Sequence, residues 1–295
     1  MVFIEMDRNT ILYLVALFTV SYSIEFIIVS EANSGNYAFA NILMILLVFM
    51  PATIAGLMVN MFKEPPYFLK TRFKDIRFFL IAYLYPLFLI VVAAILLNLL
   101  GFNIDWGLTA YKTKIYQIAL QRGISPERLY EIAMMSVLIA PFVYAMFALG
   151  EEIGWRGYLL DKLLTQNSLE RVIIFIGTIW ALWHAPLIVF MGYNYKTLRA
   201  LGLLLFIPFC IAHGAVLIWL RLRTRSILLP ALGHGAINGF MWYGSALYPD
   251  SGELLHLVLG IPGIIVVSIL GFALYMDLRR EPNIGYLLAP THGKP

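Results

Sequence analysis

Six side chains that could carry out acid–base chemistry fall into three short groups along the chain. They are Glu151, Glu152 and Arg156, then His184, then His234 and Asn238. Carboxylates and imidazoles transfer protons, and amide and imidazole N–H groups stabilise a developing oxyanion. Together these residue types suit the activation of water for hydrolysis. No serine, cysteine or threonine adjoins them in the sequence, which favours direct attack by water over a covalent intermediate.

These charged residues belong to a strongly apolar chain. Its 295 residues are 61% hydrophobic and 13% charged, whereas soluble domains average about 25% charged residues. Composition therefore predicts an integral membrane protein. An ionisable side chain at mid-membrane depth costs roughly 2.5–3.5 kcal/mol, so Glu151, Glu152 and Arg156 should face a protein-lined cavity. The net charge of +4 does not indicate a nucleic-acid partner, because Lys and Arg lie in short connections between apolar runs.

The apolar runs predict the fold. Runs long enough to cross a bilayer, about 20 residues, lie near 11–29, 39–61, 76–100, 132–150, 172–190, 201–220, 227–244 and 254–276. The first is interrupted by Glu25 and lacks a small-residue cleavage site, so we expect an uncleaved span. The sequence thus predicts an all-α polytopic membrane protein. About eight transmembrane helices would surround a polar cavity in a single domain, 1–295, with the catalytic motifs within 135–240.

The distribution of positive charge predicts the orientation. Of the 21 Lys and Arg residues, 15 lie at the termini or in the connections 62–77, 149–171 and 221–226. The positive-inside rule therefore places both termini in the cytoplasm. The membrane would be the plasma membrane of a prokaryote or the endoplasmic reticulum of a eukaryote.

Two irregular segments are expected near the fourth span. The connection 101–131 has the pattern of a short amphipathic helix on the membrane surface. A helix that ran unbroken from 126 to 164 would be about 58 Å long at 1.5 Å per residue. That length far exceeds one bilayer, so we expect a kink at Pro141 or a break near Gly150 or Gly154.

Depth and spacing connect the three groups. Glu152, His184 and His234 lie 10, 13 and 9 residues from the basic residue at the cytoplasmic flank of their helix. These counts correspond to depths of about 15, 20 and 14 Å. His234 and Asn238 are four residues apart and share a helix face, and the same spacing permits a Glu152–Arg156 ion pair. Gly233, Gly235 and Gly239 would let a neighbouring helix or a substrate backbone approach closely.

Other polar and aromatic residues are not assigned to the catalytic set. Glu25 is open between a helix-bonding role and a site role, and His213 and His256 are expected to be structural. Trp155, Trp180 and Trp183 are expected to be packing or interfacial residues and not cofactor ligands. A glutamate with two histidines could bind zinc and leave a position for water, but the chain has no His-Glu-x-x-His spacing. Zinc is therefore disfavoured, and no cofactor is predicted.

The motifs resemble a known family. Glu151-Glu152-x-x-x-Arg156, Trp180-x-x-x-His184 and His234-x-x-x-Asn238 resemble, in this order, the three motifs of the CPBP family. That family includes the type II CAAX prenyl endopeptidases, intramembrane proteases with eight helices. The one departure is Trp180, where the family usually has phenylalanine.

The resemblance implies roles for each residue. Glu151 and His184 would hold and activate the attacking water, His234 and Asn238 would form the oxyanion hole, and Glu152 and Arg156 would support the site. It also implies a glutamate-dependent mechanism without a metal. The predicted activity is an intramembrane endopeptidase that cuts a peptide bond near the cytoplasmic face of the bilayer.

The predicted partners are membrane lipids and a lipid-anchored or membrane-embedded substrate, for which a prenylated CAAX-type peptide fits. One alternative is a non-proteolytic scaffold or sensor whose polar cluster only binds a partner. A transporter is the other, but the apolar segment 187–190 argues against a polar route across the membrane.

Overall fold

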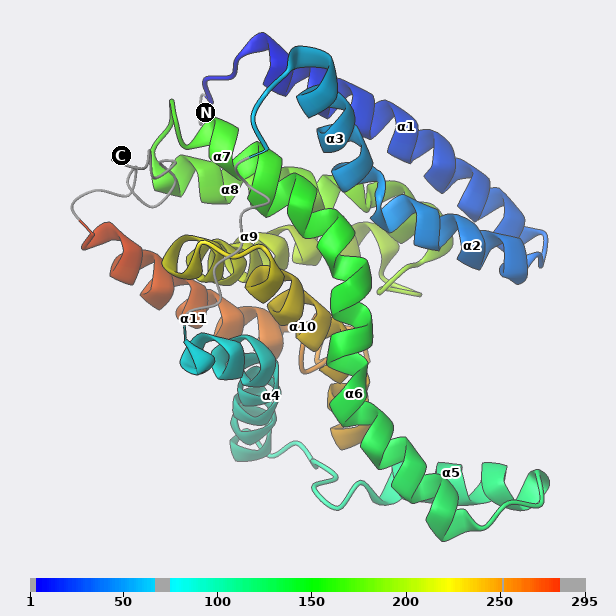
Figure 1. Cartoon of the computed structure of the whole chain (residues 1–295). Helices are drawn as coiled ribbons and strands as arrows, with labels where there is room; N and C mark the ends of the chain where they lie inside the picture. Colours follow the sequence, from blue (N-terminus) through cyan, green and yellow to red (C-terminus); the bar gives the residue numbers. More distant parts are fainter. Residues whose placement is uncertain (1–3, 67–74, 251, 282–295) are drawn as a thin grey trace.

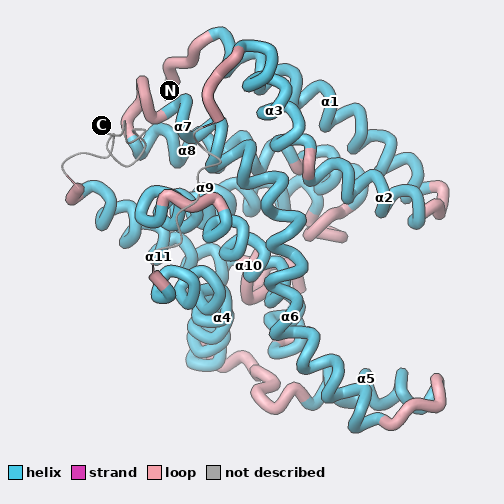
Figure 2. The backbone as a smooth tube through the Cα atoms, in the orientation of Figure 1, coloured by secondary structure: helices cyan, strands magenta, loops and turns pink. Residues whose placement is uncertain are grey.

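The computed structural model describes residues 4–66, 75–250 and 252–281. Within these ranges every regular element is a helix and there is no strand (Figures 1 and 2). The elements are α1 (Arg8–Asn33), α2 (Tyr37–Val48), α3 (Met50–Phe62), α4 (Ile76–Leu99), α5 (Thr109–Gln121), α6 (Pro126–Glu152), η2 (Ile153–Leu159), α7 (Leu160–Leu163), α8 (Leu169–Trp183), η3 (Leu187–Met191), α9 (Arg199–Thr224), α10 (Leu228–Leu247) and α11 (Ile261–Arg279). The predicted all-α class is confirmed.

Five helices of the described part are long and apolar enough to cross a membrane. They are α1, α4, the continuous run Pro126–Leu163, α9 and α11. The pair α2 and α3 passes the same test as one span bent by 42°. The count is therefore five, or six with the bent pair, which is fewer than the eight predicted. The fifth and seventh predicted spans do not pass: α8 has only 15 residues, and Gly, His and Asn interrupt α10.

The second predicted span bends between α2 and α3. Pro51 stands in the first turn of α3, where its missing N–H removes no helical hydrogen bond. The long helix packs directly against this elbow. A Cβ on Gly150 would lie 2.6 Å from the Val48 carbonyl oxygen, and a Cβ on Gly154 would overlap Pro51. Glycine at both positions therefore lets the helix that carries Glu151 approach the elbow closely.

The predicted helix in the connection 101–131 is α5, which packs against the start of α6 (Figure 1). The first turn of α6 is built from Ser125, whose Oγ accepts a hydrogen bond from the Arg128 backbone N–H, and from Pro126 at the first helical position. The location of α5 on a membrane surface stays a prediction.

The expected break in the long helix takes a different form. The helix continues to Leu163, but its hydrogen bonding changes to the π pattern over Ile153–Leu159. A π-helical turn contains about one residue more than an α-helical turn, so the side chains that follow it are rotated about the helix axis. Such segments are frequent at functional sites. Here it begins directly after Glu152 and includes Arg156.

The helix α8 ends earlier than its predicted span. His184 is the C-cap residue of α8 and does not lie within the helix. Pro186 has no backbone N–H with which to continue the α-helical ladder, and the chain proceeds into the π-helical turn η3. The imidazole of His184 is therefore presented from a helix end.

Glycines set the distance between α10 and α6. A Cβ on Gly235 would overlap the Ala145 backbone, and a Cβ on Gly239 would lie 2.7 Å from the backbone nitrogen of Pro141. The predicted close approach of a neighbouring helix to α10 is confirmed at these two glycines. It brings His234, which lies beside Gly235, against the carboxyl end of α6.

Ion pairs gather at one end of the bundle. Lys162 pairs with Glu64 and Asp7, Arg221 pairs with Asp161, and Arg223 pairs with Asp277 and Glu281. The start of α1, the end of α3, α7 and the ends of α9 and α11 thus share this ion-paired end. Such an arrangement agrees with the predicted grouping of connections, although part of the connection 62–77 lies outside the described residues. Which side of the membrane this end faces stays a prediction.

Candidate active site

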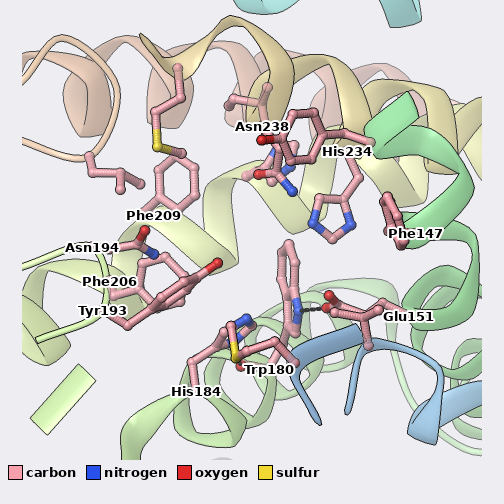
Figure 3. Close-up of a pocket in the computed structure, with 18 of the residues that line it drawn as sticks. Phe147, Glu151, Trp180, His184, Tyr193, Asn194, Phe206, Phe209, His234 and Asn238 are labelled. Atoms are coloured by element: carbon pink, nitrogen blue, oxygen red, sulfur yellow. Dashed lines mark hydrogen bonds between the residues drawn. The ribbon is translucent and has the colours of Figure 1, made fainter. Parts of the chain in front are cut away.

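A cavity of about 570 Å³ lies among α2, α6, α8, α9 and α10 (Figure 3). Glu151, His184, His234 and Asn238 all line it. These are the four residues predicted to carry the chemistry, and they come from three different helices. Their convergence on one space excludes an arrangement in which each faces a separate lipid surface.

The remaining wall of the cavity is largely apolar and aromatic. It includes Met44, Ile45, Val48, Tyr144, Phe147, Tyr193, Phe206, Phe209, Ile237, Met241 and Leu259. Ile45 and Tyr144 are 48% and 46% exposed, so the wall reaches the outer surface of the bundle between α2 and α6. A largely apolar wall with a few polar groups is typical of a ligand-binding cavity.

Part of the cavity extends away from the ion-paired end of the bundle. It extends to Tyr193 and Asn194, in the connection between η3 and α9, and to Leu259, which precedes α11. These residues follow α8 and α10, whose first turns lie beside the ion-paired end. The sequence predicted a site close to that end. Counting residues along a helix gives the level of a side chain but not the direction in which its surroundings open.

Glu151 occupies the cavity wall with a single hydrogen-bonded partner among the described residues. It is 5% exposed, and its Oε2 accepts a hydrogen bond of 2.8 Å from the indole Nε1 of Trp180. Trp180, expected to be a packing or interfacial residue, thus also donates a hydrogen bond to Glu151. Trp155 and Trp183 do pack edge to face, with ring centroids 6.0 Å apart.

Glu152 lies behind the cavity in a charged cluster. It is fully buried, and its Oε1 lies 2.9 Å from Arg156 Nη1 and 2.9 Å from His234 Nδ1. The predicted Glu152–Arg156 ion pair is therefore confirmed. The Arg156 guanidinium also lies over the Trp180 ring, with Cζ 4.2 Å from the centroid. Gly214 borders the guanidinium on α9, and a Cβ there would lie 3.2 Å from Nη2.

A hydrogen bond shows which ring nitrogen of His184 carries the proton. Its Nδ1 lies 3.0 Å from the backbone carbonyl of Trp180. A carbonyl only accepts, so Nδ1 must carry the proton. The neutral imidazole therefore has an unprotonated Nε2, which can accept a proton or bind water. Asn238 lies one turn beyond His234 on the cavity wall (Figure 3).

His213 is a cavity residue that the sequence analysis missed. Expected to be structural, it instead lines the cavity, fully buried, from α9. Its Nδ1 lies 3.0 Å from the Tyr85 hydroxyl, which also lies 3.0 Å from the Gly233 carbonyl. Because that carbonyl takes the hydroxyl proton, Nδ1 donates to Tyr85 and Nε2 is an acceptor. Counting depth from Arg221, eight residues away, would have put His213 near the level of His234.

Glu25 remains outside the set. It is fully buried in α1, and neither carboxyl oxygen has a hydrogen-bond partner among the described residues. It does not line the cavity, although it is near enough to Glu151 for an electrostatic interaction.

His256 has the expected structural role. It precedes α11, where its Nδ1 accepts hydrogen bonds from the backbone N–H groups of Val258 and Leu259, and its Nε2 lies 2.9 Å from the Ser245 hydroxyl. Burial lowers the pKa of His256 to about 4.

Within the described ranges, no group of three or more His, Cys, Asp or Glu side chains is arranged to hold a metal ion. Glu151 and the two predicted histidines share the cavity, where Glu151 Oε2, His184 Nδ1 and His234 Nδ1 are hydrogen-bonded to the Trp180 indole, the Trp180 carbonyl and Glu152, and Glu151 Oε1 and the two Nε2 atoms are left.

Comparison with known proteins supports the motif analysis. Residues 133–240 match the family described as "Type II CAAX prenyl endopeptidase Rce1-like". The chain is also 34% identical, over 156 residues, to CAAX prenyl protease 2 of Methanococcus maripaludis. That alignment covers 51% of this chain and 52% of the relative, so the chain spans about half the length of the relative it matches. The predicted resemblance to type II CAAX prenyl endopeptidases is confirmed over the matched segment, which contains all six predicted site residues.

Proposed function

We propose that this protein is an intramembrane endopeptidase that hydrolyses a peptide bond of a membrane-associated substrate. The observation that carries the proposal is the convergence of Glu151, His184, His234 and Asn238 on one cavity. The match of residues 133–240 to a family of prenyl endopeptidases supports the same reaction class.

Glu151 and His184 would activate the attacking water. Glu151 Oε2 is occupied by the indole donor, so Oε1 is the oxygen left to accept a proton from water. The unprotonated Nε2 of His184 is the second acceptor in the cavity. Water held between two acceptors can lose its proton as its oxygen attacks the carbonyl carbon of the scissile bond. That proton then passes to the departing amine as the C–N bond breaks.

His234 and Asn238 would stabilise the oxyanion formed during attack. The Nδ1 of His234 lies 2.9 Å from Glu152 Oε1 and donates to that carboxylate. His234 can therefore donate from Nε2 only as an imidazolium. In that form His234 presents an N–H group to the oxyanion, and Asn238 adds an amide N–H group. Preorganised donors of this kind are often the largest single contribution to acyl-transfer catalysis.

The substrate would be a lipid-anchored or membrane-embedded peptide, of which a prenylated CAAX-type peptide is the leading candidate. An anchor would deliver the scissile bond to a cavity that lies within the helix bundle. The apolar wall that reaches the surface between α2 and α6 suits such an approach from the membrane. The Methanococcus relative, named as a CAAX prenyl protease, supports the same substrate class.

The direct test is hydrolysis of a fluorogenic prenylated CAAX peptide by the purified protein in lipid nanodiscs. Glu151→Gln keeps the size of the side chain and removes the base, so hydrolysis should fall by at least a thousandfold. Glu131→Gln, an exposed substitution on α6, is the matched control and should retain full activity. Unchanged hydrolysis by Glu151→Gln would reject the assignment of the base.

Two further measurements define the substrate and the metal question. The same peptide without its prenyl group should be cut more slowly if the anchor delivers the bond. Activity that survives dialysis against a strong zinc chelator supports the metal-free reaction, and loss that zinc alone restores would replace it with a metal-assisted one.

The orientation of the protein in the membrane needs its own experiment. Most Lys and Arg residues lie near the ion-paired end of the bundle, whereas the cavity extends toward Asn194, away from that end. We propose that both termini are cytoplasmic, on the strength of the positive-inside rule. Cys210 is the only cysteine and is buried, so an introduced cysteine can be labelled specifically. Thr165→Cys at the ion-paired end should react with a membrane-impermeant reagent only from the cytoplasmic side. Labelling from the opposite side would reverse the orientation and turn the Asn194 end of the cavity to the cytoplasm.

A further inference from the structure

We propose that Trp180 is a positioning residue for Glu151: its indole N–H holds one carboxyl oxygen so that the other faces the attacking water. This inference rests on the proposed function, because it assigns a purpose to a contact with the proposed base. The contact itself is the 2.8 Å hydrogen bond from Trp180 Nε1 to Glu151 Oε2 (Figure 3).

The indole is fixed from several directions. Trp180 is 2% exposed, and the Arg156 guanidinium covers one part of its ring at 4.2 Å. The His234 ring meets it nearly perpendicularly, with centroids 5.1 Å apart. Its backbone carbonyl also accepts from His184 Nδ1. A side chain held in this way cannot swing away without disturbing three other residues of the site, so its N–H is a preorganised donor.

The bond constrains Glu151 in two respects. A glutamate side chain has three rotatable bonds, and anchoring Oε2 removes most of that freedom at the carboxylate. Orientation of this kind contributes strongly to rate, since a displacement of about 1 Å can reduce activity about a hundredfold. A neutral N–H donor also stabilises the ionised carboxylate without neutralising it. The carboxylate therefore stays a base and keeps one oxygen directed at the cavity.

Other charged and titratable groups also surround Glu151. They are Glu25 on α1, Glu152 at the end of α6, Arg156 in η2, His184 at the end of α8, His213 on α9, His234 on α10 and Tyr193 in the following connection. A substitution at Trp180 leaves these groups in the chain. A change in pH dependence can therefore be assigned to the lost indole donor if a matched tryptophan substitution nearby does not produce it.

The test compares Trp180→Phe with Trp183→Phe. Both replace a buried indole by a phenyl ring, and Trp183 Nε1 has no hydrogen-bond partner among the described residues. We expect Trp180→Phe to lower kcat on the prenylated peptide about tenfold at neutral pH, with little change in KM. The acidic limb of its kcat profile should move toward higher pH. Trp183→Phe should leave both the limb and the kcat nearly unchanged.

Equal profiles for the two variants would overturn the proposal and leave Trp180 as a packing residue. This outcome differs from failure of the proposed function, in which Glu151→Gln itself remains active. Should Trp180→Phe fail to fold, the indole N–H resonance of Trp180 in the tryptophan-labelled, folded Glu151→Leu protein gives the answer. That resonance should move relative to the wild type while that of Trp183 stays; an unmoved Trp180 resonance would refute the contact.

Discussion

Glu151 and Glu152 are neighbours in the chain but lie in two different environments. Glu151 faces the cavity and accepts one hydrogen bond from a neutral indole. Glu152 points away from the cavity into a fully buried cluster, where Arg156 and His234 both reach the same oxygen. Successive helical residues point about 100° apart, so a single step along α6 separates a carboxylate that can accept a proton from one that holds charges in place.

This contrast concerns how the helix bundle accommodates the proposed base in an apolar setting. A buried carboxylate next to a guanidinium is stabilised as an anion and is a poor proton acceptor. Arg156 pairs with Glu152 and leaves Glu151 without a cationic hydrogen-bond partner. Trp180 connects Glu151 with Arg156, because its indole N–H donates to Glu151 and its ring face contacts the guanidinium. The π-helical segment begins at Ile153 and carries Arg156 into this position.

The largest expected effect separates the two carboxylates directly. Glu151→Gln should reduce kcat at least a thousandfold with little change in thermal stability, because it removes the base and leaves the Arg156 pair intact. Glu152→Gln should lower both stability and activity, because it leaves Arg156 buried without its counter-charge. Paired measurements of kcat and thermal unfolding check this contrast. Similar profiles for the two variants would mean that the residues do not have distinct roles.

A second prediction concerns the buried ion pair. Arg156→Met should destabilise the protein by about 3–5 kcal/mol, because it strands the Glu152 carboxylate in a buried site. The double variant Glu152→Gln/Arg156→Met removes both charges and should recover a large part of that loss. Denaturant unfolding in mild detergent measures both values. A double variant no more stable than the single one would show that packing, and not charge, dominates this cluster.

A third prediction concerns His256, which lies outside the site. The direction of its effect on stability with pH follows from its pKa. Burial lowers the pKa of His256 from 6.5 to about 4, so the folded protein favours the neutral imidazole. His256 does not reduce the free energy of unfolding above pH 6.5. As the pH falls toward 4, the unfolded chain binds a proton that the folded protein does not, and the free energy of unfolding decreases by up to about 3 kcal/mol. His256→Asn retains an acceptor and does not titrate. Thermal unfolding from pH 7.5 to 4 should be less steep for this variant; parallel curves would contradict the prediction.

The smallest expected effect tests Nε2 of His213, which has no hydrogen-bond partner among the described residues. Asparagine can reproduce the Nδ1–H donor to Tyr85 but has no counterpart to Nε2. His213→Asn should therefore raise KM by about threefold, the effect of one lost neutral hydrogen bond, if the substrate backbone donates to Nε2. His213→Gln is the companion variant, because the glutamine amide can reproduce an acceptor at the position of Nε2. Identical KM values for both variants and the wild type would restore the structural assignment.

Local pattern predicted much of the site. Four-residue spacing identified the Glu152–Arg156 pair, and glycines beside His234 identified the close approach of α10. These features depend on helix periodicity and side-chain size, which the sequence carries directly. His213 was missed because a lone histidine on an apolar helix has no neighbour in sequence to mark it. Only the meeting of α9 with the cavity distinguishes it from a packing residue.

By itself, the sequence determined that the chain is helical and apolar, and that its few polar residues recur at similar depth. Apolar length, charge spacing and side-chain chemistry act locally, so they can be read without the fold. Tertiary structure alone decided that the long helix passes into a π segment and that Trp180 binds Glu151. Each depends on contacts between residues distant along the chain: packing against the α2–α3 elbow, against α9 and across the cavity sets which way each side chain points.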